Sequence, residues 1–384
     1  MALSSNNQSD WRGIKPLKAE AALSPTLPGY FYHQQSVFEE EKERIFYRHW
    51  QLVAHVSQLR EPGDFVTLRI IDQSVFVIRG EDSIIRGFYN VCQHRAHELL
   101  EGQGCVKSRI VCPYHNWNYN INGDLKSVYR CKQPQFDMSE HGLVEVRVEQ
   151  MLGFLFVNLD PEAPTLGEIS GDMFDDIKVN VPDWESMVAV PQLDSRKFPR
   201  AALHTNWKVL SENSLENYHV QTIHPAYAKM VDIDSYQWQM KGLWIKGWGK
   251  IQSLDSEAYN IEESEASHLA ITWRLWPNTA FFLLPGESSF SVVRYHPESP
   301  DLTLRSNITL VRPGQTINED RWSYLWGTIW EEDAKICESV HRGLRSKGYR
   351  QGRFMINAEE PSISEYGPHL FQRNYAKTMG ILED

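Results

Sequence analysis

The sequence has little positive charge, few cysteines and no long apolar segment. Of its 384 residues, 39 are Lys or Arg and 50 are Asp or Glu, so the formal net charge is −11. This excess of acidic groups argues against nucleic acid as a partner. No apolar run approaches the length of a membrane span, and residues 1–6 lack the basic and apolar regions of a secretory signal. We therefore expect a soluble, cytoplasmic protein with no membrane partner.

The chain also lacks a disulfide framework and a nucleotide-binding fingerprint. Of its five cysteines, Cys105, Cys131 and Cys337 show no framework spacing, so we expect reduced thiols that act as small buried hydrophobes. The segment Gly247-Trp248-Gly249 has neither the third glycine nor the strand–turn–helix setting of a dinucleotide site. A nicotinamide or flavin site is therefore not expected in this chain.

The other two cysteines lie in short segments that each pair a cysteine with a histidine. These segments are Cys92-Gln93-His94 and Cys112-Pro113-Tyr114-His115. Structural zinc is one interpretation, but zinc fingers place their histidines as a pair after the cysteine pair. One Cys and one His from each segment instead suit a Rieske 2Fe-2S cluster, in which thiolates hold one iron and neutral imidazoles hold the other. We predict that Cys92, His94, Cys112 and His115 hold such a cluster.

A second candidate metal site follows downstream. Asn206 can cap a helix on which Glu216 and His219, three residues apart, share a face. His224 and His219 can reach one ion only if the helix loosens between them, and Pro225 permits such an ending. Two histidines and a carboxylate are the donor set of non-heme iron(II) sites that activate O2. A pair of capping or core histidines is the alternative, but an electron carrier needs an acceptor, which favours iron.

These motifs resemble the catalytic α subunits of Rieske non-heme iron oxygenases over nearly the whole chain, including N-W-K at Asn206–Lys208 and E-x-Y-H-x4-H-P at Glu216–Pro225. The resemblance implies that His219 and His224 bind iron. It also implies that Glu216 bridges a Rieske histidine of one subunit to the iron site of its neighbour. The third ligand is implied to be a carboxylate near the C-terminus. We choose Asp333, with Glu332 and Glu338 as the alternatives.

The fold expected from the resemblance is α+β, with a small all-β Rieske domain and a helix-grip-type catalytic domain built on an antiparallel sheet. We place the N-terminal arm and the start of the first helix, opened by a capping box at Ser36, at 1–45, the Rieske domain at 46–160 and the iron domain at 161–384. A helical stretch is predicted from about 318 to 346. Runs rich in β-branched and aromatic residues predict strands at Phe65–Ile70, Ser74–Arg79, Ile84–Tyr89, Leu143–Glu149, Gly153–Leu159, Thr279–Leu284, Phe290–Tyr295 and Leu302–Leu310.

The resemblance implies the terminal component of an oxygenase that uses O2. Since no nicotinamide or flavin site is expected, electrons must come from a separate NAD(P)H-dependent reductase. A head-to-tail homotrimer is implied as well, because electrons in this family cross a subunit interface. A Rieske electron-transfer protein without oxygenase activity explains the cluster equally well, but it leaves His219, His224 and Asp333 without a task.

The sequence gives fewer signals for the substrate than for the metal cofactors. The run Val340–Ser346 resembles α subunits that act on choline, betaines and carnitine-like quaternary amines, with His341 where that branch usually has Gln. The 13 Trp and 16 Tyr residues would allow an aromatic cage for a methylammonium group, although core packing explains such residues too. We expect N-demethylation or hydroxylation of a quaternary ammonium compound, with ring hydroxylation of an aromatic carboxylate as the alternative.

Overall fold

The computed structural model describes residues 15–130, 135–190, 201–262 and 267–382 and divides into two compact units. Phe46–Ala189 forms one unit, and the residues before and after it form the other. This division by contacts lies at 45/46 and 189/190, so residues 161–189 are grouped with the Phe46–Ala189 unit, and the domain bound predicted at 45/46 stays a prediction. The functional boundary at 160 therefore remains a prediction. Cys131 lies outside the described residues.

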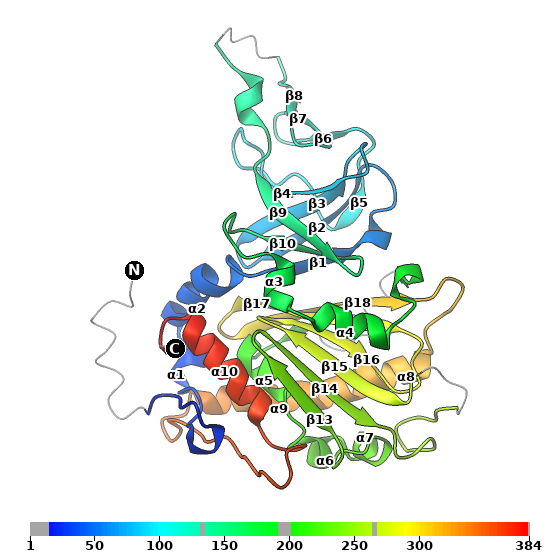
Figure 1. Ribbon diagram of the computed structural model, residues 1–384. Coiled ribbons are helices and arrows are strands. Elements are labelled where there is room, and N and C mark those ends of the chain that lie inside the picture. Colours follow the sequence, from blue (N-terminus) through cyan, green and yellow to red (C-terminus); the bar gives the residue numbers. More distant parts are fainter. Residues whose placement is uncertain (1–14, 131–134, 191–200, 263–266, 383–384) are drawn as a thin grey trace. The chain divides into compact units, whose positions relative to one another are not determined.

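The Phe46–Ala189 unit is an antiparallel β structure (Figure 1). A seven-stranded sheet has the order β1, β10, β9, β4, β3, β2, β5, and a three-stranded sheet has the order β6, β7, β8. All five strands predicted in this part of the chain are confirmed. The strands are β1 (Gln51–His55), β2 (Asp64–Ile70), β3 (Gln73–Arg79), β4 (Ile85–Tyr89), β5 (Gln103–Cys105), β6 (Arg109–Val111), β7 (Asn118–Asn120), β8 (Leu125–Ser127), β9 (Glu145–Met151) and β10 (Phe154–Asn158).

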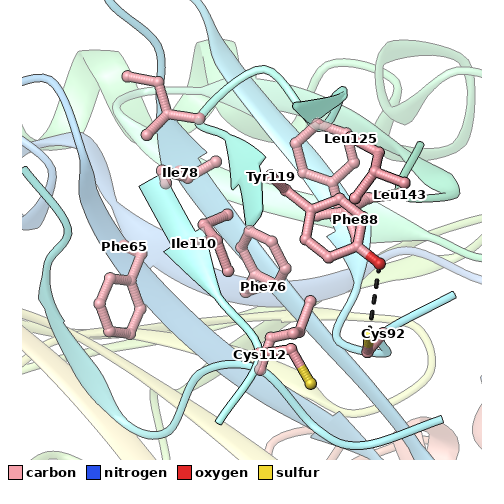
Figure 2. Close-up of a cluster of buried hydrophobic side chains, with 12 residues drawn as sticks. Phe65, Phe76, Ile78, Phe88, Cys92, Ile110, Cys112, Tyr119, Leu125 and Leu143 are labelled. Atoms are coloured by element: carbon pink, nitrogen blue, oxygen red, sulfur yellow. Dashed lines mark hydrogen bonds between the residues drawn. The ribbon is translucent and has the colours of Figure 1, made fainter. Parts of the chain in front are cut away.

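One apolar core holds the two cysteine segments. Phe76, Phe88 and Tyr119 are at most 1% exposed, and the side chains of Cys92 and Cys112 belong to the same cluster (Figure 2). Full burial of each large apolar side chain contributes about 1.5–3 kcal/mol. Because both cysteines are part of the core, packing fixes where the two segments lie. Cys105 on β5 is exposed instead, so its predicted burial is wrong, whereas Cys337 is buried as predicted.

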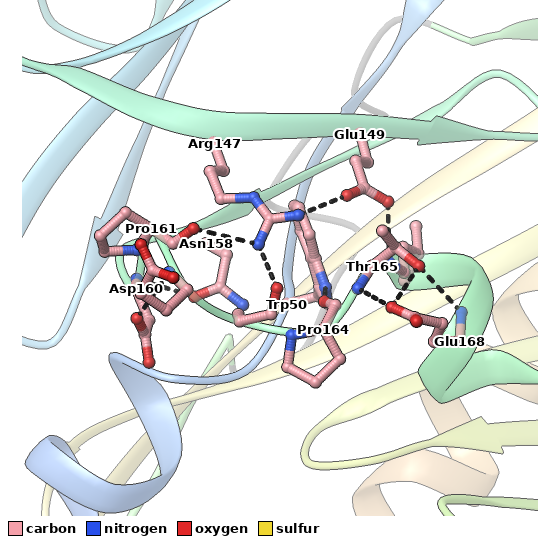
Figure 3. Close-up of polar contacts among 12 residues, drawn as sticks. Trp50, Arg147, Glu149, Asn158, Asp160, Pro161, Pro164, Thr165 and Glu168 are labelled. Atoms are coloured by element: carbon pink, nitrogen blue, oxygen red, sulfur yellow. Dashed lines mark hydrogen bonds and ion pairs between the residues drawn. The ribbon is translucent and has the colours of Figure 1, made fainter.

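Polar contacts explain why the chain after residue 160 stays with the β unit (Figure 3). Trp50 Nε1 donates to the Pro164 carbonyl at 2.9 Å, and Arg147 of β9 donates to the Ala163 carbonyl. Glu149 accepts from the N–H of Leu166 at 2.7 Å, where α3 (Leu166–Ser170) begins before α4 (Met173–Asn180). The segment at the predicted 160/161 boundary is therefore hydrogen-bonded to residues of the preceding β structure.

The second unit is built on an antiparallel meander. Strands β13 to β18 follow one another in the sheet in sequence order, with β12 beside β18. The three strands predicted here are confirmed, and with the helices below they confirm the α+β class. The strands are β12 (Ala202–Leu203), β13 (Gln237–Lys241), β14 (Trp244–Lys250), β15 (Leu269–Leu275), β16 (Thr279–Leu283), β17 (Phe290–Ser299) and β18 (Leu302–Val311).

Helices cover this sheet. Helix α5 (Trp207–Asn213) contacts α9 (Trp330–Leu344), α10 (Tyr366–Thr378) and strand β17. The predicted helical stretch from 318 to 346 is confirmed as α8 (Glu319–Ser323), a π-helical segment at 324–329 and α9. The shorter helices are α1 (Tyr30–His33), α2 (Gln35–Glu41), α6 (Val220–Ile223) and α7 (Pro225–Met230).

The capping box predicted at Ser36 is wrong. Helix α2 begins at Gln35, and its N-cap is Gln34, which lies two residues before the predicted N-cap Ser36 and makes no side-chain hydrogen bond. Helix α1 ends just before it, and Tyr32 and Phe38 are buried. Packing of these apolar side chains therefore fixes the helix start without a cap.

No helix in the described part of the chain has the length and apolar character needed to span a bilayer.

A buried ion pair anchors the helix that leads to the histidines. The Lys208 ammonium of α5 contacts the Glu41 carboxylate of α2, and the two side chains are 0% and 1% exposed. Glu41 also accepts from Trp207 Nε1 at 2.9 Å and from the Tyr375 hydroxyl of α10 at 2.7 Å. Burial lowers the pKa of Lys208, and the charge of Glu41 opposes that effect. Helices distant in sequence are thus joined around one carboxylate.

Lys208→Met is expected to destabilise the protein by about 3–5 kcal/mol, because it leaves the Glu41 carboxylate buried without its counter-charge. Urea titration with matched transition slopes would measure the loss. Lys229→Met is the control, since Lys229 and Glu257 are 62% and 71% exposed and such a pair contributes about 0–1 kcal/mol. Equal stability of the two variants would contradict an anchoring role.

Candidate metal centres

The two cysteine segments fold into matching loops. In each loop the cysteine N–H donates to the carbonyl five residues on, at 2.9 Å. The cysteine carbonyl accepts from the residue four on, at 3.0 Å for Cys92 and 2.9 Å for Cys112. That residue has a left-handed φ in both loops, 56° at Ala96 and 55° at Asn116, which is uncommon outside glycine. The paired loops predicted from the sequence are therefore alike in backbone geometry.

The loops place two buried thiols beside two histidine rings. Cys92 and Cys112 are 2% and 1% exposed, and burial raises the pKa of the Cys92 thiol. The His94 and His115 ring centroids are 4.6 Å apart. Nδ1 of His115 is buried and has no hydrogen-bond partner among the described residues. A buried nitrogen without a partner calls for a ligand, so this donor set fits a cluster held by two thiolates and two imidazoles.

Neighbouring side chains hold the loops in place. Trp117 stacks on the His94 ring at a centroid distance of 4.9 Å. The Tyr119 hydroxyl lies 3.4 Å from Cys92 Sγ and accepts from the N–H of Gln93 at 3.0 Å. Hydrogen bonds to cluster sulfurs tune reduction potentials. Tyr119 was not predicted as a site residue, since its only signal in the sequence is a polar aromatic residue close after the second cysteine segment.

The predicted second site lies where two short helices meet. Helix α5 ends at Asn213, so Glu216 and His219 do not share a helix face as predicted; a turn brings them together. His219 is the N-cap of α6, and His224 separates α6 from α7 with φ −119° and ψ 57°. The helix is therefore interrupted at His224, as the sequence required for both histidines to reach one ion.

His219, His224 and Asp333 converge. Among the described residues they form a group whose ligand atoms all lie within 4.8 Å of one another. Asp333 Oδ1 is 2.9 Å from Nε2 of His224 and 3.6 Å from Nε2 of His219. The outward Nδ1 atoms contact carboxylates, His219 with Glu216 at 2.5 Å and His224 with Glu332 at 2.7 Å. Carboxylates on the outer nitrogens orient both rings and leave Nε2 free for a metal.

The electrostatics of this group favour a cation. Burial disfavours the charged form of His219, but Asp333 and Glu216 outweigh it and raise the pKa to about 10. The pKa of His224 is raised in the same way, against burial, by Asp333. Burial acts to raise the pKa of Asp333, but hydrogen bonds from His219 and His224 hold it well below its usual range. A divalent cation would take the place of these protons.

The two alternative carboxylates have other contacts. Glu332 bonds to the outer nitrogen of His224, and Glu338 accepts from the N–H of His204 at 3.1 Å. Asp333 is the carboxylate that faces both Nε2 atoms, although its assignment as a ligand remains a prediction. The contact of Glu332 with His224 was not predicted, because Glu332 was considered only as an alternative metal ligand.

A cavity of about 160 Å³ borders this group. Glu216, His219, His224 and Asp333 contribute to its lining, as does Arg274 of β15. Arg274 was also missed, although an arginine inside the apolar run Ile271–Trp276 signals a buried charge that needs a partner. The rest of the lining combines aliphatic and small polar residues with seven aromatic ones, Tyr227, Tyr236, Trp238, Phe282, Tyr295, Trp326 and Trp330.

Two family descriptions match the chain. "Rieske [2Fe-2S] domain" matches residues 49–146, and "Ring hydroxylating alpha subunit (catalytic domain)" matches residues 190–381. The chain belongs to the Rieske non-heme iron oxygenases. Its cofactors are therefore a Rieske 2Fe-2S cluster and iron(II), as predicted, and neither structural zinc nor electron transfer alone accounts for both domains. In this Rieske oxygenase the two groups of candidate ligands described above lie one in each unit.

Relatives of this Rieske oxygenase share nearly its full length. The carnitine monooxygenase oxygenase subunit of Acinetobacter pittii is 34% identical and the match covers 92% of this chain and 94% of that protein. Choline monooxygenase of Atriplex hortensis is 29% identical over 93% of this chain and 80% of its own length. A solved quaternary ammonium Rieske monooxygenase superimposes with a TM-score of 0.86 at 32% identity, covering 94% of this chain and 97% of that one.

Proposed function

We propose that this Rieske oxygenase oxidises a small quaternary ammonium compound by hydroxylation or N-demethylation. The observation that carries the proposal is the aromatic cavity beside His219, His224 and Asp333. Aromatic faces attract a methylated ammonium group, which cannot donate hydrogen bonds, through their negative electrostatic potential. Two kinds of relatives, named for carnitine and for choline, act on compounds with such a group.

The proposed roles follow from the donor geometry. Cys92, His94, Cys112 and His115 hold the cluster, and His219, His224 and Asp333 hold the iron. Activation of O2 with electrons stored singly at the cluster is the chemistry that the two cofactors supply when bound. Glu216 and Glu332 keep the histidine rings oriented. The aromatic wall excludes water and holds the substrate beside Asp333.

The proposed partners are O2, a separate NAD(P)H-dependent reductase and two further copies of this chain. Trimer formation is proposed because Glu216 would then lie between the iron site of one subunit and the cluster of the next. A cytoplasmic location is proposed as well. It is supported by Cys92, Cys105, Cys112 and Cys337, which are free of disulfides and so fit a reducing compartment.

Substrate-dependent O2 uptake tests this function. With a surrogate reductase and NADH, we expect quaternary amines to stimulate uptake at least about tenfold, because the cage favours the cation by roughly 2 kcal/mol or more when desolvated. Aromatic carboxylates should have no effect. NADH without reductase should give no turnover. Uptake driven by aromatic acids alone would replace the proposal by ring hydroxylation, and NADH oxidation without a reductase would refute the separate donor.

A further inference from the structure

Arg274 is a partly buried arginine whose buried donor atoms are not all used. Its side chain borders the cavity next to Asp333, and its Nη2 donates to the Ser214 carbonyl at 3.1 Å. Its Nε and Nη1 have no hydrogen-bond partner among the described residues. The guanidinium lies over the Phe282 ring, 4.6 Å from the centroid. Such a group normally binds a carboxylate in a two-point fork.

The protein itself provides little to balance this charge. Burial lowers the pKa of Arg274, while Tyr295, Tyr236 and Asp333 act in the opposite direction. Asp333, the one carboxylate among them, is already engaged by His219 and His224. An arginine with idle donors in an apolar interior is costly unless an acceptor enters the site. The cavity next to Asp333, about 160 Å³ in volume, has room for such an acceptor.

A water molecule is the competing acceptor. Arg274 also borders a second cavity of about 30 Å³, together with Ser214 and Tyr295. That volume holds about one water, which could satisfy one donor and leave the guanidinium a purely structural group. The two interpretations differ in whether removing Arg274 changes how the protein distinguishes charged from uncharged ligands.

We propose that Arg274 binds the carboxylate of the substrate, so that this enzyme selects betaines, which carry a quaternary ammonium group and a carboxylate on one short chain. This inference rests on the proposed function and narrows it. The aromatic wall takes the cationic end, and Arg274 takes the anionic end. A substrate with only a positive charge, such as a choline-like alcohol, would meet the uncompensated charge of Arg274 in an apolar cavity. A betaine compensates that charge.

Binding of γ-butyrobetaine and of its primary amide tests the proposal, because the two probes differ little in shape. Tryptophan fluorescence of the anaerobic, metal-loaded enzyme would give both dissociation constants. The wild type should bind the carboxylate about ten- to a hundredfold more tightly than the amide, as expected for a buried charge-assisted pair. Arg274→Gln should bring the ratio close to one. Arg274→Lys should give an intermediate ratio, since an ammonium keeps the charge without the fork.

The control variant is Arg294→Gln, which removes a guanidinium that is 2% exposed on β17 of the same sheet and does not border the cavity. Its ratio should match that of the wild type. Equal binding of both probes by the wild type overturns the proposal without any variant, and so does an unchanged ratio in Arg274→Gln or Arg274→Lys. If neither probe nor choline binds or stimulates O2 uptake, the proposed function itself fails.

Discussion

Asp333→Ala is expected to abolish substrate oxidation and to lower the iron content from about three to about two atoms per chain, the numbers that a cluster with and without a mononuclear iron would give. The visible spectrum of the Rieske cluster should stay unchanged, because Asp333 and the cysteine loops belong to separate units. Loss of one of the three proposed protein ligands would remove both a negative charge and a coordinating atom from the site. Metal analysis and the absorption spectrum of the same sample would measure both effects.

The matched control is Glu338→Ala on the same helix, where the carboxylate contacts the His204 backbone. It should keep the full iron content and activity. Glu332→Ala should lie between the two, since it removes the contact to His224 Nδ1 and such outer contacts typically change metal affinity by about 10–100-fold. Retention of the mononuclear iron in Asp333→Ala, with its loss in Glu332→Ala, would transfer the ligand role to Glu332.

Glu216→Gln is expected to slow electron transfer from the cluster to the mononuclear iron while both metal centres stay occupied. The amide keeps the shape of the side chain but removes the charge that contacts His219 Nδ1 at 2.5 Å. If Glu216 connects the iron site to a Rieske histidine of a neighbouring subunit, electron transfer should slow by at least about 10–100-fold. Stopped-flow reoxidation of the reduced cluster after addition of substrate and O2 would measure the rate.

Iron content and trimer mass in Glu216→Gln should match the wild type, so a slow reoxidation could not be attributed to lost cofactor or lost assembly. Glu257→Gln is the control, because this carboxylate is 71% exposed and pairs only with Lys229 among the described residues. It should reoxidise at the normal rate. Normal single-turnover reoxidation in Glu216→Gln itself would remove this residue from the electron path.

Local chemistry in the sequence was enough to predict the class of this protein. Each candidate ligand motif is short. The two cysteine–histidine segments, and the histidine pair ahead of Pro225, can each be recognised from a few neighbouring residues. Metal preference depends on donor type and spacing, which are local properties. Eight predicted strands were found for the same reason, since runs of β-branched and aromatic residues carry their own signal. The capping box at Ser36 failed because apolar packing, which no local signal reports, sets the start of α2.

Tertiary structure decided everything that depends on direction in space. Asp333 and His224 are 109 residues apart, and sequence spacing could not distinguish Asp333 from Glu332. Adjacent residues on a helix point about 100° apart, and only the packing of α9 shows which of them faces the histidines. In the same way, tertiary contacts joined residues 161–189 to the β unit and left Arg274 of β15 beside the cavity. The sequence alone was thus enough to predict which metal cofactors the protein uses and which class of reaction it catalyses, because each residue's identity fixes which donor atom it offers. The fold decided which carboxylate faces the two histidines and which arginine borders the cavity, because these depend on where distant side chains converge.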